Sequence, residues 1–189
     1  MSAGKTAAAC EIISRLTDRG YVCAGAKLTG VAALKDMLNM SDHGAVTTLS
    51  FIDCGYPSTV GVTDVAPIAK KVLRSIERYA KQELDVVVAE MGDGIIGAYG
   101  VDTILGDAEF RTFIKAHVLC ANDLVAAWGG VRWMNERSLK LNVIAGPATD
   151  NSVGTTYIEN ELGIAAGNAR TDPERFVDLV EEAAFPGDT

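Results

Sequence analysis

The chain has 189 residues, of which 48% are hydrophobic and 22% are charged, and its formal net charge is -8 at pH 7. This length suits one domain with a sizeable buried core, so we expect residues 1–189 to form a single domain. Only 5 prolines are present, and this composition excludes a fibrous or disordered chain. The negative charge argues against nucleic acid or an anionic membrane surface as the main partner, and it leaves room for a local basic pocket.

The cysteines and the N-terminus indicate the cellular compartment. The four cysteines are scattered without a C-x-x-C pair, and neither histidine lies in metal-ligand spacing with one of them. This pattern predicts buried, reduced thiols and argues against a zinc site. The sequence has neither a basic start followed by a long apolar run nor a stretch of about 18 uninterrupted apolar residues. We therefore expect a cytoplasmic location, without export or membrane spanning.

Helical and strand patterns alternate along the chain. Residues 6–19 carry alanine and isoleucine at helical spacing and stop at Gly20, which suits a helix end. Apolar runs typical of buried parallel strands follow at 21–26, 47–53, 85–90, 116–121, 140–145 and 164–167. The strongest later helical patterns are 64–83, 122–136 and 172–184. This order predicts an α/β fold with an open, mostly parallel sheet and helices on both faces.

The opening segment SAGKT matches the end of a phosphate loop. A complete loop reads G-x-x-x-x-G-K-[ST] after a buried strand, and its backbone N–H groups and the next helix N-terminus wrap a phosphate chain. Gly4, Lys5 and Thr6 fit the last three positions, whereas the first glycine would fall two residues before Met1. Either the start is truncated or the motif is accidental.

The strand that feeds such a loop is central in a parallel sheet, so its absence would leave backbone groups of two neighbours unpaired. By analogy with the order of the motif, we expect about ten more residues before Met1, which would supply an apolar strand and the first glycine. Without them the chain should be less stable and bind nucleotide weakly, and it would rearrange or recruit a neighbouring chain. The alternative is that the start is authentic and SAGKT merely begins a helix.

Charged residues stand at the ends of three predicted strands. Lys27 follows the first strand, Asp53 ends the second and Glu90 ends the third, and a glycine trails each of them. In open parallel sheets ligands bind beyond the carboxyl ends of strands, so these groups should converge. A phosphate-loop enzyme needs a lysine for the phosphates, a hydroxyl for magnesium and carboxylates for that ion, which Lys5, Thr6 and the two carboxylates supply. The alternatives are that Asp53 caps a turn and that Lys27 is a solvated strand end.

Three loops offer further binding groups, each with a structural alternative. In DCGYPSTVG the proline and glycine fix the course of the loop, and the hydroxyls suit a second substrate. The alternative is a tight connection to helix 64–83 in which Ser58 or Thr59 is a local backbone cap. The glycines of MGDGIIGAYG allow close approach to a ligand or movement as a flap, or they only turn the chain. Asp150 and Asn151 offer groups suited to an adenine or guanine edge, although an Asx turn that caps a helix near Val153 is the stronger interpretation.

The layout resembles the phosphate-loop NTPases of the dethiobiotin synthetase and cobyrinate diamide synthase group. In that group a strand after the G-K-T helix ends in lysine and a later strand ends in glutamate within a glycine-rich turn, here AGAKLTG and VVVAEMGDGIIGAYG. The segment HVLCANDLVAAWGGVRWMNERSLKLNVIAGPATDN is similar to the synthetase order of strand, asparagine, helix, strand and terminal asparagine. A closer resemblance, through AKLTG, DCGYPST and VVVAEMGDG, is to uncharacterised bacterial proteins. They are often labelled as molybdopterin-guanine-dinucleotide type or as of unknown function, and the family name carries no established reaction.

The resemblance implies a nucleotide site that uses ATP or GTP with Mg²⁺, a small-molecule substrate and a homodimer. Our first hypothesis is an enzyme of ligase, synthetase or kinase type, in which Lys5 holds the phosphates and Thr6, Asp53 and Glu90 hold the metal. Lys27 would stabilise charge on the transferring group. The rival hypothesis is a nucleotide-binding regulatory or structural domain without turnover. The expected nucleotide site comprises Ser2, Ala3, Gly4, Lys5, Thr6, Asp150 and Asn151.

Overall fold

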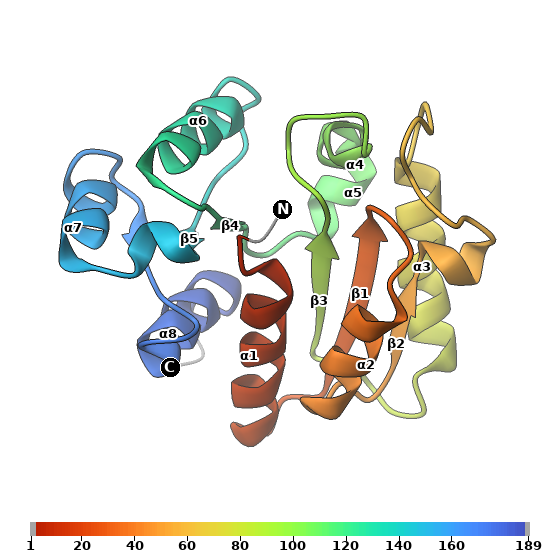
Figure 1. The fold of residues 1–189 in the computed structure, drawn as a ribbon. Helices are drawn as coiled ribbons and strands as arrows, with labels where there is room; N and C mark the ends of the chain where they lie inside the picture. Colours follow the sequence, from red (N-terminus) through yellow and green to blue (C-terminus); the bar gives the residue numbers. More distant parts are fainter. Residues whose placement is uncertain (1–2, 188–189) are drawn as a thin grey trace. The chain divides into compact units, whose positions relative to one another are not determined.

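A computed structural model describes residues 3–187 of the chain (Figure 1). Within them the strands are β1 (Cys23–Thr29), β2 (Thr48–Ser50), β3 (Val86–Met91), β4 (Val118–Cys120), β5 (Val143–Ala145) and β6 (Ala165–Ala166). The α-helices are α1 (Lys5–Asp18), α2 (Leu34–Asp42), α3 (Ala66–Tyr79), α4 (Val101–Gly106), α5 (Ala108–Phe113), α6 (Leu124–Asn135), α7 (Ser152–Asn160) and α8 (Pro173–Ala184). Two short 3-10 helices, η1 (Phe51–Cys54) and η2 (Pro147–Thr149), follow β2 and β5. None of the helices within this part of the chain is both long and apolar enough to cross a bilayer.

The described strands form two parallel sheets of three strands, with the orders β2-β1-β3 and β4-β5-β6. The chain divides into two compact units, of which the first is Ile12–Phe113 and the second combines residues 3–11 with residues 114–187. The predicted α/β fold with parallel strands and helices is confirmed. The strands belong to two hydrogen-bonded sheets, however, where the alternation predicted one. The single domain over residues 1–189 stays a prediction.

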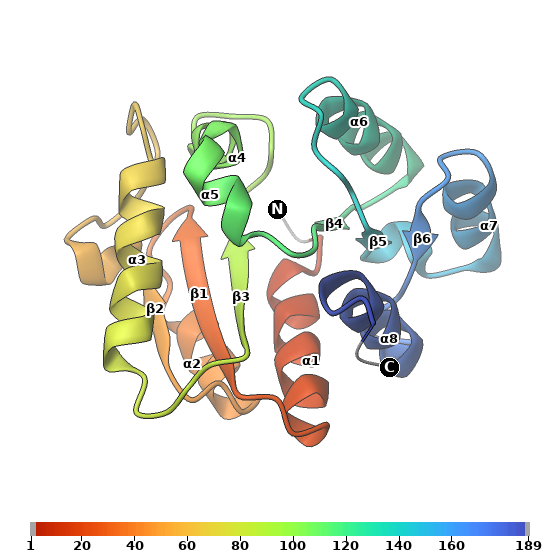
Figure 2. The ribbon, with the colours of Figure 1, turned by 180° about the vertical axis from the view of Figure 1, so that it is seen from behind.

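In the first unit, β1 is the central strand, and all seven of its residues are buried. Helices α2 and α3 lie on opposite faces of this sheet, as the two opposed views show (Figures 1 and 2). A Cβ atom at Gly25 would lie 2.8 Å from the Met40 sulfur, so the glycine allows α2 to pack closely on β1. A central strand covered on both faces has the continuous apolar run that the sequence shows here.

In the second unit, β5 is the central strand, and its three residues are buried. Local capping groups start the two helices that follow. Asn151 caps α7 through a hydrogen bond from the Gly154 N–H, and Asp172 caps α8 through one from the Arg175 N–H. Side-chain acceptors at this position satisfy N–H groups that lack a partner within the helix, which is why both helices begin where they do.

Two of the differences from the predicted strand boundaries bear on the candidate site. The strand predicted over 47–53 is wrong in its second half, because β2 ends at Ser50 and the next residues form η1. A reciprocal capping box explains the change: the Ile52 N–H donates to Ser50 Oγ at 3.2 Å, and the Ser50 N–H donates to Asp53 Oδ2 at 2.7 Å. Lys27 lies within β1 and does not follow it, because pairing with β3 extends β1 to Thr29.

Candidate functional site

The G-K-T segment opens helix α1, as the motif predicts. The helix begins at Lys5, and the Ala8 N–H donates to the Gly4 carbonyl at 2.9 Å. Gly4 is exposed with φ +81°, and Lys5 and Thr6 are half-buried. The unpaired N–H groups of a first helical turn carry partial positive charge, so this end of α1 suits an anion. Ser2, the first residue of the expected nucleotide site, lies outside the described residues.

The start of α1 lies at the carboxyl ends of β4 and β5 in the second unit. A Cβ atom on Gly146, the residue after β5, would lie 2.5 Å from the Ala3 carbonyl oxygen and 3.0 Å from that of Ala121. Ala121 follows β4, and its N–H donates to the Ala145 carbonyl at 2.9 Å. The motif residues therefore begin at the sheet edge where α/β proteins bind ligands.

Asp150 and Asn151 lie in the connection between η2 and α7, and both make structural hydrogen bonds. Asn151 Oδ1 accepts from the Gly154 N–H at 3.0 Å, so the predicted Asx cap is confirmed. Asp150 Oδ1 accepts from the Asn168 side chain at 2.8 Å. Asn168 is buried and also donates to Thr149 Oγ1 at 3.0 Å. This amide ties the loop after β5 to the loop after β6, a role that the sequence analysis missed.

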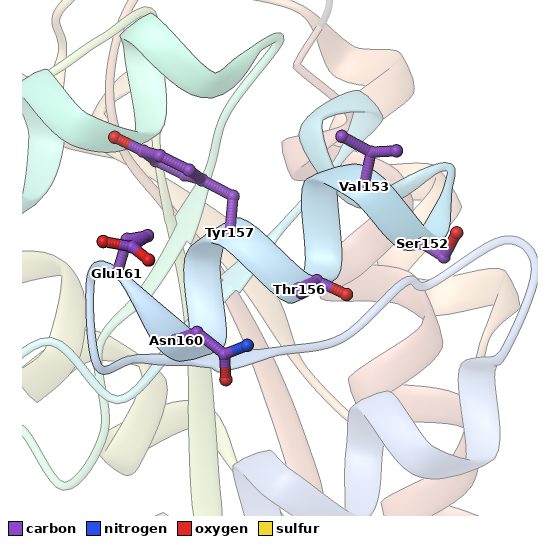
Figure 3. A pocket seen from close by; sticks show the side chains of 6 residues that line it. All are labelled: Ser152, Val153, Thr156, Tyr157, Asn160 and Glu161. Atoms are coloured by element: carbon purple, nitrogen blue, oxygen red, sulfur yellow. The ribbon is translucent and has the colours of Figure 1, made fainter.

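Two cavities lie beside α7. One of about 230 Å³ lies between the starts of α7 and α8 and includes polar side chains of Asp150, Asn151, Thr155 and Arg175 in its lining. The other, of about 400 Å³, is lined by α7 and its C-terminal neighbour alone (Figure 3). Figure 3 shows that its side chains project from one helix and do not converge on a point. The smaller cavity is therefore the better candidate for a ligand.

In the first unit, three polar residues form a row across the carboxyl ends of β2, β1 and β3. Lys27 is the register partner of Ser50 on β2 and of Glu90 on β3. Register partners in parallel strands point to the same face of the sheet. Lys27 and Glu90 are only 6% and 7% exposed, so the alternative of a solvated strand end for Lys27 is wrong. The Lys27 ammonium donates to Asp36 Oδ2 in α2, a partner that the sequence analysis missed.

Asp53 and its neighbour Cys54 lie in η1. Asp53 is exposed and completes the capping box with Ser50, so the alternative that it caps a turn is confirmed, while its metal-binding role stays a prediction. None of the four cysteines is joined to another in a disulfide, and Cys54 and Cys120 are only partly buried. Burial raises the pKa of the Cys54 and Cys23 thiols. A raised pKa disfavours the thiolate, and these cysteines are therefore poor nucleophiles.

The loop DCGYPSTVG is bound to the loops that follow β1 and β3. Thr59, which is fully buried, accepts from the Gly30 N–H at 2.9 Å and donates to the Tyr99 carbonyl at 2.8 Å. Ser58 Oγ donates to the Gly30 carbonyl at 3.2 Å. Ser58 Oγ also accepts from the Val60 N–H at 3.1 Å, so the predicted local backbone cap is confirmed for Ser58. Thr59 bonds distant backbone groups instead, and contact with a second substrate stays a prediction. The three loops at this edge are thus held together by two side chains.

We expect Thr59→Val to lower the free energy of unfolding by about 1–3 kcal/mol, because the isosteric change leaves the Gly30 N–H and the Tyr99 carbonyl without their buried partner. Urea unfolding monitored by circular dichroism measures this loss. Thr63→Val, at an exposed position shortly after this loop, is the control, with an expected change within about 0.5 kcal/mol. Equal effects of the two substitutions would contradict the role given to Thr59.

The predicted site residues fall into both compact units. Lys5, Thr6, Asp150 and Asn151 belong to one unit, and the three charged strand-end residues of the sequence analysis belong to the other. Their assembly into one site stays a prediction. Within residues 3–187, no three His, Cys, Asp or Glu side chains are grouped so as to hold a metal ion.

Comparison with known proteins gives a structural likeness. No protein-family model matches the sequence, and no curated protein matches it. The structure is similar to that of the signal recognition particle 54 kDa protein from Aeropyrum pernix K1 in complex with GDP, with a TM-score of 0.58 and 18% sequence identity. The match covers 98% of this chain and 44% of that one, so this chain spans less than half of its length. The predicted P-loop NTPase fold is confirmed, and the likeness to the dethiobiotin synthetase group stays a prediction.

Proposed function

We propose that this protein binds the phosphate chain of a nucleotide at the N-terminus of α1. One observation carries the proposal: Gly4, Lys5 and Thr6 open a 14-residue helix at the carboxyl ends of β4 and β5, in a P-loop NTPase fold. The N–H groups of the first turn donate to phosphate oxygens, and the Lys5 ammonium neutralises their charge. The GDP complex of the similar protein supports a nucleotide over other anions.

The nucleobase is proposed to lie against Asp150 and Asn151, beside the smaller cavity. Both residues follow β5 in the same compact unit as the start of α1. The helix cap uses Asn151 Oδ1, which leaves the amide nitrogen as a donor. The hydrogen bond from Asn168 goes to Asp150 Oδ1, so the other carboxylate oxygen is available as an acceptor. A donor beside an acceptor suits the edge of a purine, in ATP or in GTP.

We propose further that the bound nucleotide transfers a phosphoryl group to a small metabolite. Thr6, Asp53 and Glu90 offer a hydroxyl and two carboxylates, which are the hard oxygen ligands that Mg²⁺ prefers, directly or through water. When bound, the ion would neutralise charge on the phosphates. Lys27 would donate to an oxygen of the transferring group. Each of these residues fits the ion by the chemistry of its oxygen ligand.

A second candidate is nucleotide binding without turnover. The observation that favours it is the structural use of two proposed catalytic groups: Asp53 Oδ2 accepts from the Ser50 N–H, and the Lys27 ammonium is paired with Asp36. Groups with such roles need not take part in chemistry. Measurement of phosphate release with and without a panel of metabolites separates the two candidates.

Calorimetric titration with GDP, GTP, ADP and ATP, with and without MgCl₂, tests the proposed function. We expect saturable binding of either the guanine nucleotides or the adenine nucleotides, with a higher affinity when Mg²⁺ is present.

Asp53→Asn and Glu90→Gln should weaken nucleotide binding in the presence of Mg²⁺ by about tenfold and leave binding without Mg²⁺ unchanged, because the amide keeps the shape of the side chain and loses its charge. Glu77→Gln, on the exposed side of α3, is the control. Equal losses with and without Mg²⁺ would argue against the metal role, and no binding by the wild type would refute the proposal.

A further inference from the structure

The packing of α2 on the sheet brings Asp36 to Lys27. Gly25 and Lys27 are two residues apart and share one face of β1, and Asp36 and Met40 are four apart and share one face of α2. The Met40 sulfur occupies the space beside Gly25, 2.8 Å from where a Cβ would be. One helical turn away, Asp36 Oδ2 accepts a hydrogen bond from the Lys27 ammonium. The contact therefore follows from the register of the helix on the strand.

The pair is largely withdrawn from water. The Lys27 side chain is 8% exposed and that of Asp36 is 19% exposed. Removing two charges from water is costly, and apolar residues of similar volume are often as stabilising as a buried ion pair. Stability alone therefore gives little reason for this pair. The position of the Lys27–Asp36 pair does give a reason. The pair stands at the carboxyl end of a central parallel strand, beside the buried Glu90 carboxylate on the next strand.

We propose that Asp36 is a positioning residue that holds the Lys27 ammonium ready for an anionic oxygen, a carboxylate or phosphoryl oxygen of the second substrate. A lysine ammonium has three N–H donors, and the contact with Asp36 Oδ2 uses one of them. An ammonium at the end of a flexible four-carbon chain loses considerable freedom when it binds an anion. The hydrogen bond to Asp36 already restricts the Lys27 side chain before an anion binds. The inference rests on the proposed function, because it concerns the group that receives the phosphoryl.

The test uses the reactivity of the Lys27 amine toward acetic anhydride, measured at fixed pH by peptide mass spectrometry of the full chain. Inorganic phosphate is the anionic probe. In the wild type, Lys27 should react slowly, and phosphate should slow it further. Asp36→Asn should speed Lys27 acetylation by about tenfold, the effect of losing a charge-assisted hydrogen bond, and should abolish protection by phosphate. Asp36→Glu should restore both properties in part, because it returns the carboxylate.

Asp42→Asn is the matched control, because Asp42 ends the same helix at an exposed position and should leave Lys27 reactivity unchanged. Circular dichroism checks that each variant is folded. Phosphate that fails to protect Lys27 in the wild type, or that protects it equally in Asp36→Asn, would overturn the proposal. Lys5 is followed in the same digests with nucleotide and Mg²⁺. In the wild type, Lys27 protected by phosphate while Lys5 is not protected by nucleotide would count against the nucleotide site. Lys5 protected by nucleotide while Lys27 is not protected by phosphate would count against the role of Asp36.

Discussion

Lys5→Ala is expected to weaken nucleotide binding by about 2–3 kcal/mol, a loss of roughly 30- to 150-fold in affinity. Lys5 is the first residue of α1 and is half-buried. Side chains of a helix tilt toward its N-terminus, so the Lys5 ammonium can reach a phosphate that the first-turn N–H groups hold. Those N–H groups remain in the variant, and they should retain weak binding of the phosphate chain. Calorimetric titration of both proteins with the nucleotide that the wild type prefers measures the difference.

The fold should survive this substitution, because alanine is the best helix former and the side chain is half-buried. Lys35→Ala, at an exposed position in α2, removes one positive charge elsewhere and controls for the change in net charge. Lys5→Arg keeps the charge and should recover only part of the affinity, because the guanidinium differs in shape and length. Affinity unchanged in Lys5→Ala would remove the phosphate-loop interpretation of SAGKT.

Gly146→Ala is expected to lower the free energy of unfolding by about 2–4 kcal/mol, from a strained backbone and a steric clash together. Gly146 has φ +90°, a conformation that residues with a Cβ rarely adopt. Its Cβ would lie 2.5 Å from the Ala3 carbonyl oxygen and 3.0 Å from that of Ala121. Both neighbours are backbone atoms, which cannot rotate away as a side chain would. Thermal and urea unfolding measure the loss.

Gly163→Ala separates the two causes. Gly163 also has a positive φ, of +68°, but its Cβ would meet no atom within 4 Å, so this variant should show only the conformational cost of about 1–2 kcal/mol. Gly146→Ala should also weaken nucleotide binding, because relief of the clash displaces Ala3, the residue before the G-K-T segment. Equal destabilisation by the two variants, with nucleotide affinity kept, would contradict the close contact between Gly146 and the start of α1.

The sequence by itself determined the class of fold and the approximate positions of its strands and of the helices with the clearest patterns. Each of the six predicted strands overlaps an observed one, because a parallel strand buried on both faces needs a continuous apolar run. The starts of α7 and α8 could be predicted from Asn151 and from the Asp172-Pro173 pair, since a cap acts on N–H groups two or three residues away. Such signals lie within a few neighbouring residues, so they can be read along the chain.

The tertiary structure alone decided the contacts that shape the candidate site. The Lys27 contact with Asp36 depends on the register of α2 against β1, and Thr59 bonds residues 29 and 40 positions away. The grouping of the strands into two sheets depends likewise on which distant strands pair. No short pattern encodes these partners, because a hydrogen bond between distant residues forms only after helices and strands have packed. Even the local end of β2 escaped prediction, since the Ser50 and Asp53 capping box competed with an apolar run that indicated a longer strand.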